Sequence, residues 1–137
     1  MNRKVFYSVI EEIGTFADES AFKKKYMSII NSDKKRYKEV IAIENTVEPG
    51  MPDLLVIDNK DKATFVEVKY ARKGVMSFKK TQIPWYRAHR HLNIIILAYN
   101  DETHNIHMID SAVILTEARG TRYKLDREDQ FTLEGLL

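Results

Sequence analysis

The sequence predicts a single α/β domain in which a small mixed β-sheet is flanked by helices. A helical apolar pattern comes first, three strand-like runs follow, and a fourth apolar run comes after a second amphipathic segment. The 137 residues suffice for one domain with a real core but not for two. We therefore expect one domain over residues 1–137, with a core at about 4–110 and a C-terminal extension at 111–137 of undetermined structure.

The N-terminal segment is predicted to be a helix over about residues 4–30. Apolar residues recur there at the spacing of three and four that marks one helical face. They are Phe6, Val9, Ile10, Ile13, Phe16 and Ala17. The turn-forming sequence Asn31-Ser32-Asp33 predicts the end of this helix.

The middle of the chain contains three predicted strands, Val40–Ile43, Leu54–Ile57 and Thr64–Tyr70. The polar residues Asp58–Asp61 predict a hairpin loop between the second and the third. The third strand should therefore be antiparallel to the second.

A second amphipathic segment ends near Leu92 and contains Pro84. Proline inside a helix costs about 3 kcal/mol, but in the first turn its missing N–H has no helical partner to lose. The helix therefore either begins after an N-cap at Thr81 or begins at Ser77 and kinks. The sequence favours neither alternative.

The run Asn93–Tyr99 is apolar on both faces, which is typical of a central or parallel strand. A helix between this strand and the third predicts a right-handed crossover and a parallel pair. Ile106–Ile109 is the last strand expected. Beyond it Ala112–Leu115 is apolar and Gly120 breaks the pattern, while residues 126–137 fit a helix or a strand equally well.

The charge distribution is uneven although the net charge is only +2. No Asp or Glu occurs between Val68 and Asn100, and the basic residues of that interval are Lys69, Arg72, Lys73, Lys79, Lys80, Arg87 and Arg90. A second basic cluster occupies residues 23–25 and 34–38. Such clusters indicate a polyanion such as nucleic acid as partner, although a solvated helix face gives the same pattern.

Several classes of protein are disfavoured. The absence of cysteine excludes disulfides and thiolate metal sites. The longest apolar run, Ile94–Tyr99, is far shorter than the roughly 20 residues of a membrane span. Glu11 and Glu12 interrupt the apolar residues near the N-terminus, so no signal-peptide core is found and a cytoplasmic, non-secreted protein without a membrane partner is expected.

Three charged residues accompany the second and third predicted strands. Glu67 and Lys69 share one face of the third strand because side chains alternate, and burying them costs several kcal/mol per ion unless each is paired. Asp53 begins the neighbouring strand, about 4.8 Å away, so the two carboxylates can converge on a divalent ion such as Mg²⁺. The alternative is a cross-strand ion pair, with Pro52-Asp53 serving only as a turn.

These residues resemble the motifs of a known nuclease family. The sequences Gly50-Met51-Pro52-Asp53-Leu54 and Glu67-Val68-Lys69, followed by Gln82 and Trp85, are similar to the PD-(D/E)xK nuclease superfamily. The similarity is greatest to its virus-type replication-repair (VRR-NUC) nucleases and archaeal Holliday-junction resolvases, and it spans Val40 to about Tyr99. It implies a restriction-endonuclease-like α-β-β-β-α-β core and Mg²⁺-dependent cleavage of DNA, with Mn²⁺ as a substitute ion.

The resemblance also implies roles for individual residues. Asp53 and Glu67 would bind the metal, with the backbone carbonyl of Val68 as a third ligand. Lys69 would position or deprotonate the attacking water and neutralise charge on the phosphate. Gln82 would point toward the site as a supporting catalytic residue.

Many members of the superfamily also use a glutamate from the first helix. Glu12 is nearer the apolar face than Glu11 and is the candidate metal ligand, with Glu19 as a weaker alternative. Trp85 is expected in the core. The histidines show no metal-ligand spacing.

Phosphate contacts are predicted for six cations of the acid-free interval. They are Arg72, Lys73, Lys79, Lys80, Arg87 and Arg90.

The predicted function is thus a Mg²⁺-dependent deoxyribonuclease. A junction resolvase would be a homodimer, whereas an exonuclease or nicking enzyme need not be. The apolar sequence at residues 131–137 fits a dimer surface or core packing equally well. The alternative from another class is a non-catalytic DNA-binding or structural module on the same fold.

Overall fold

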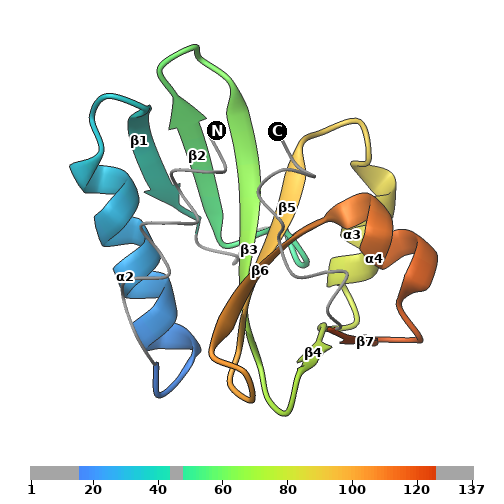
Figure 1. The fold of residues 1–137 in the computed structure, drawn as a ribbon. Helices are drawn as coiled ribbons and strands as arrows, with labels where there is room; N and C mark the ends of the chain where they lie inside the picture. The colour runs from blue at the N-terminus through green and yellow to red at the C-terminus, as the bar shows by residue number, and fades with distance from the viewer. Residues whose placement is uncertain (1–15, 44–47, 126–137) are drawn as a thin grey trace.

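The computed structural model describes residues 16–43 and 48–125, which form a mixed α/β fold of a sheet covered by helices (Figure 1). The predicted fold class is confirmed. In chain order the main elements are α2 (Glu19–Ser32), β1 (Tyr37–Ala42), β2 (Leu54–Asp58), β3 (Ala63–Ala71), β4 (Val75–Ser77), α3 (Gln82–Ala88), β5 (Ile94–Asn100), β6 (Asn105–Asp110), α4 (Ser111–Glu117) and β7 (Arg122–Lys124).

Five of the strands form one sheet in the order β1-β2-β3-β5-β6. The pair β3–β5 is parallel and the other neighbouring pairs are antiparallel, as expected for a crossover through α3. Every residue of β5 is buried, which agrees with its apolar sequence. The parallel register sets Glu67 beside Ile96 and Lys69 beside Ala98.

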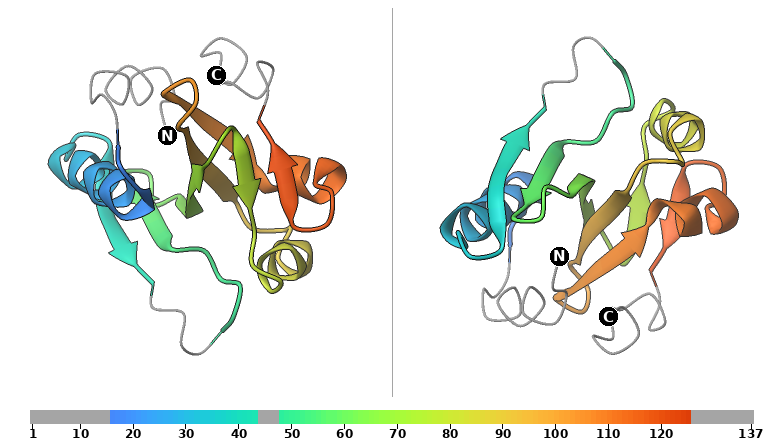
Figure 2. Two further views of the ribbon diagram at one scale, coloured as in Figure 1. Left: turned by 90° about the horizontal axis from the view of Figure 1, so that it is seen from below. Right: turned by 90° about the horizontal axis from the view of Figure 1, so that it is seen from above.

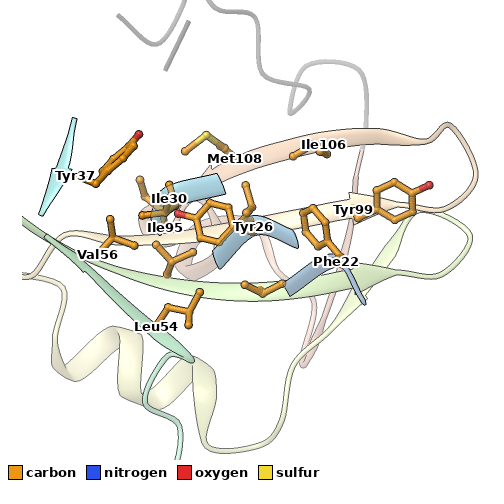
Figure 3. Packing of buried hydrophobic residues seen from close by; sticks show 13 residues of the cluster. Phe22, Tyr26, Ile30, Tyr37, Leu54, Val56, Ile95, Tyr99, Ile106 and Met108 are labelled. Atoms are coloured by element: carbon orange, nitrogen blue, oxygen red, sulfur yellow. The ribbon is translucent and has the colours of Figure 1, made fainter. Parts of the chain in front are cut away.

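The two faces of the sheet bury separate cores. Figure 2 shows α2 on one side of the sheet and α3 with α4 on the other. On the α2 side, Phe22, Tyr26 and Ile30 pack against Val56 and Ile95 of the sheet, as seen in Figure 3. Glu67 and Lys69 alternate with residues of that core, so their side chains belong to the other face.

The first described helix begins later than the sequence predicts. Asp18 is its N-cap, and its carboxylate accepts a hydrogen bond from the Ala21 N–H at 2.8 Å. The prediction of a continuous helix through residues 16–18 was therefore wrong. Phe16 nevertheless packs in the core, with its ring centroid 5.2 Å from that of Phe22, which explains why the apolar spacing continued into it. The other predicted helix-face residues, 6–13, lie outside the described part.

Helix α3 begins at Gln82 with Thr81 as its N-cap residue, so the kinked alternative from Ser77 is wrong. Pro84 lies in the first turn, where it removes no helical hydrogen bond. The Thr81 side chain makes no capping bond. The helix ends at Ala88, before the expected Leu92.

The C-terminal part of the chain adds two elements that the sequence did not predict. Helix α4 begins after Asp110, whose carboxylate accepts from the Ala112 N–H at 2.9 Å. Strand β7 pairs with β4 in a small second sheet. Residues 131–137 lie outside the described part, so their predicted roles stay open. No helix among the described residues is long and apolar enough to cross a membrane.

Candidate functional site

The predicted acids Asp53 and Glu67 meet at the end of the sheet where β2 begins and the second half of β3 passes. Asp53 Oδ2 accepts a hydrogen bond from the Val68 N–H at 3.2 Å, and the Asp53 carboxyl lies close enough to Glu67 to raise the pKa of that residue. Glu67 is buried, whereas Asp53 is half-buried. The contact seen at Val68 is through its N–H, and its carbonyl as a metal ligand stays a prediction.

Gln82 joins the other two predicted residues of the site. Its Nε2 donates to Glu67 Oε1 at 2.9 Å, while its Oε1 accepts from Lys69 Nζ at 2.8 Å. The same Oε1 accepts from the Lys79 N–H at 2.8 Å. Because these contacts need an amide with one donor end and one acceptor end, glutamine fits this position and glutamate does not.

Burial governs the charges of this cluster. Burial, the hydrogen bond with Asp53 and the Asp53 charge together raise the pKa of Glu67 well above its ordinary range. Burial lowers the pKa of Lys69, against the opposing effect of the Glu67 carboxylate. The Lys69 ammonium also lies 4.9 Å from the centre of the Phe78 ring. A bound cation would therefore favour the ionised form of Glu67, and a bound phosphate would favour the ionised form of Lys69.

Helix α2 contributes two residues that the sequence analysis did not assign firmly. Lys23 Nζ lies 3.7 Å from Asp53 Oδ1. One turn earlier, partial burial raises the pKa of the Glu19 carboxyl, an effect that the nearby Lys69 opposes and Asp53 reinforces. Glu19 is therefore the first-helix glutamate seen beside the site, and Glu12 lies outside the described residues. The sequence signal that could have favoured Glu19 is the N-cap residue Asp18, because it places Glu19 in the first turn of the helix.

Tyr86 is a further residue at the cluster. Its hydroxyl is buried and has no hydrogen-bond partner among the described residues. Burial raises the pKa of Tyr86, and the charges of Glu67 and Asp53 raise it further. The spacing of four from Gln82 places Tyr86 on the same side of α3, although no role was predicted for Tyr86.

The segment that carries Asp53 is fastened to α3. Gly50 has φ +94°, and a Cβ added there would lie 2.2 Å from the Thr81 carbonyl oxygen, so only glycine allows this approach. Trp85 Nε1 donates to Glu48 Oε1 at 2.8 Å. Trp85 is only 7% exposed, which confirms its predicted place in the core.

The predicted phosphate contacts all lie on the surface. Arg72, Lys73, Lys79, Lys80, Arg87 and Arg90 are exposed. The charge of Lys79 contributes to the lowered pKa of Lys69, so the two ammonium groups lie near each other. Arg72 instead packs its guanidinium 5.4 Å from the centre of the Tyr70 ring.

The donor set fits a hard divalent ion. Asp53 and Glu67 offer carboxylate oxygens at one point, and Mg²⁺ is usually held by one or two carboxylates together with water and substrate phosphates. Within residues 16–43 and 48–125, no group of three or more acidic or histidine side chains is arranged to hold a metal. Two carboxylates are thus the side-chain ligands that this structure offers.

The fold was compared with those of known proteins. It is similar to that of a bacterial homing endonuclease, I-Ssp6803I. The similarity has a TM-score of 0.50 at 17% sequence identity, and it covers 90% of this chain and 86% of the other. No family model and no curated protein sequence matches the chain. The comparison shows a shared nuclease-like fold.

Proposed function

We propose that this protein is a metal-dependent deoxyribonuclease of the PD-(D/E)xK type. The observation that carries the proposal is the pair of hydrogen bonds by which Gln82 joins Glu67 to Lys69, with the Asp53 carboxyl beside Glu67. A buried acid and a buried lysine on one strand face are costly, and the same arrangement is what phosphodiester hydrolysis requires. The nuclease-like fold of the homing endonuclease neighbour supports the proposal.

The chemistry divides among the residues of the site. Asp53 and Glu67 would hold Mg²⁺ or Mn²⁺, with Glu19 at the edge of the site. When bound, a divalent ion lowers the pKa of a water ligand and neutralises the phosphoryl oxygens. Lys69 places a cation beside the attacked phosphate, and Gln82 fixes its Nζ at 2.8 Å from the amide oxygen.

The substrate is proposed to be DNA, bound through the exposed cations around α3. Cleavage within a strand is favoured over exonuclease action because the structural neighbour is an endonuclease. Selectivity for four-way junctions rests on the family resemblance alone, as does the homodimer that it would need. The test below therefore includes junction DNA.

The test is to incubate linear, supercoiled and four-way-junction DNA with the protein and Mg²⁺ or Mn²⁺. Glu67→Gln and Lys69→Met should lower cleavage at least about 100-fold, as expected for groups that stabilise the transition state. Glu39→Gln, on an exposed position of β1, is the matched control and should cleave normally. Equal activity of Glu67→Gln, or no cleavage by the intact protein, would falsify the proposal.

A second candidate function is DNA binding without cleavage. It is favoured by the absence, among the described residues, of a third acid arranged for a metal. Metal-independent DNA binding with no cleavage in either metal would select it. Cleavage confined to junctions, together with a dimeric solution mass, would instead select a resolvase.

A further inference from the structure

The small sheet formed by β4 and β7 displays basic residues that extend beyond the carboxylates of the proposed nuclease site. Together with its flanking residues it exposes six cations, which we name the basic ribbon. They are Lys73, Lys79, Lys80, Arg119, Arg122 and Lys124. Three of them, from the α4–β7 turn and β7 itself, lie outside the acid-free interval that the sequence analysis singled out.

Strand alternation gives the ribbon one charged and one apolar face. Tyr123 is buried opposite Met76, and both belong to the core beneath α3 and α4. Arg122 and Lys124, on either side of Tyr123, are exposed and point the other way. Their cross-strand partners are the uncharged Ser77 and Val75, so no side chain of β4 neutralises them.

The cations of the basic ribbon are also unpaired within the described residues. Ion pairs there bind Lys23, Arg36 and Lys38 to carboxylates, and they include no member of the ribbon. Asp101 Oδ1 accepts a hydrogen bond from the backbone N–H of Lys73 at 2.7 Å and not from the Lys73 ammonium. Unpaired like charges gathered on one surface repel each other, and an anionic partner removes that cost.

The ribbon adjoins the nuclease site directly. The Phe78 N–H, which follows β4, donates to the Thr121 carbonyl beside β7 at 2.8 Å. The Phe78 ring lies 4.9 Å from Lys69 Nζ, and the N–H of the next residue, Lys79, binds Gln82. A polyanion bound along the basic ribbon would therefore extend toward Asp53 and Glu67.

We infer that the basic ribbon binds the DNA phosphates that flank the cleaved bond and so sets the position of the strand in the site. This inference rests on the proposed nuclease function for the identity of the polyanion. Cations on a short, rigid strand pair contact phosphates without reading sequence. The ribbon should therefore add affinity that depends on salt and is independent of sequence.

The experiment measures binding of the full-length protein to fluorescein-labelled duplex DNA by anisotropy, in EDTA so that no cleavage occurs, across a series of salt concentrations. The ribbon variant is Arg119→Gln/Arg122→Gln/Lys124→Gln. The control variant is Lys60→Gln/Lys62→Gln, which removes two positive charges from the β2–β3 hairpin, outside both basic clusters of the sequence. Its residues are exposed at the other end of the molecule, where Asn59 ties the β2–β3 hairpin to the chain before β1.

The ribbon variant should reduce the slope of log Kd against log salt by about 2.7, because each lost phosphate contact is worth about 0.9. The control should leave the slope unchanged. A ribbon variant that binds like the intact protein, or a control that loses as much, overturns the inference. The single substitution Arg122→Gln, with an expected slope change of about 0.9, decides the matter if the triple variant fails to fold.

The two proposals fail in different ways. If the intact protein cleaves DNA but the ribbon variant binds normally, the ribbon inference is wrong and the nuclease function stands. If the ribbon variant binds weakly but the intact protein cleaves nothing, the ribbon inference stands without the nuclease function.

Discussion

The amide of Gln82 is the only contact through which Glu67 and Lys69 are joined in the described structure, with hydrogen bonds of 2.9 Å and 2.8 Å. The two charged residues face the same way on β3, yet neither bonds directly to the other. Orientation of the acid and the base therefore depends on a residue from a different element, α3.

Replacing Gln82 with methionine keeps the side-chain length and removes both bonds, together with the one that Gln82 Oε1 accepts from the Lys79 N–H. Two buried polar groups then lose a partner, at about 1–3 kcal/mol each, so the free energy of unfolding should fall by about 2 kcal/mol or more. Nuclease activity should fall at least about tenfold, because Lys69 loses its fixed position. Urea denaturation and cleavage assays measure the two effects, and an unchanged rate would show that the bridge has no part in catalysis.

The stability of the metal-free protein should depend on pH through Glu67. Its folded pKa is raised by burial and by Asp53, so the native state binds the proton more strongly than the unfolded chain. The stabilisation is complete below the unfolded pKa of about 4.3 and is lost as the pH rises above it. The melting temperature in EDTA should thus fall between about pH 5 and about pH 8.

The matched variant for this pH dependence is Glu67→Gln, which cannot titrate. Its melting temperature should stay flatter over the same range. At alkaline pH the lowered pKa of Lys69 acts in the opposite direction, since the unfolded chain then binds the additional proton. Identical pH profiles for the intact protein and the variant would contradict the assigned shift.

Lys23 should compete with a metal ion for Asp53, because its ammonium lies 3.7 Å from Asp53 Oδ1. Lys23→Met should therefore tighten the binding of Mn²⁺, measured by calorimetry without DNA, by about threefold to tenfold, as expected for the loss of one partly exposed cation. The exposed neighbour Lys24 is the control, and Lys24→Met should bind as the intact protein does. Weaker or equal Mn²⁺ binding by Lys23→Met would show that no such competition exists.

Gly50 should tolerate no side chain. Gly50→Ala forces a Cβ to 2.2 Å from the Thr81 carbonyl at φ +94°, so a loss of about 2 kcal/mol or more in unfolding free energy is expected. Gly120 also has positive φ, at +61°, but a Cβ there meets nothing within 4 Å. Gly120→Ala should therefore cost only about 1 kcal/mol, and equal losses would contradict the packing argument.

Strong local signals allowed the central part of the fold to be predicted from sequence. The β2–β3 hairpin and the parallel β3–β5 pair followed from alternation, turn residues and the apolar run of β5. The start of α2 was missed because the helix begins only after the N-cap residue Asp18, while Phe16 keeps the apolar spacing through packing alone. A periodic apolar pattern indicates which residues are buried, and Phe16 is partly buried although it lies before the start of the helix.

The residues of the site that lie close together in sequence were predictable, whereas the residue contributed by the distant helix α2 was not. Asp53, Glu67, Lys69 and Gln82 were assigned from strand patterns and family resemblance, and the structure brings them together. The approach of Lys23 depends on how α2 crosses the sheet, which no local pattern encodes. Strands β4 and β7 have three residues each, too few for a periodic signal.

The parallel pairing of β3 with β5 has a consequence for how this chain can vary. Glu67, Lys69 and Gln82 all belong to the β3–α3–β5 unit, and Asp53 lies just ahead of it. The reactive groups are thus encoded by one continuous stretch, residues 53–82. We therefore expect insertions and substitutions after β5 to change the surface around the proposed site without altering the four residues that form it.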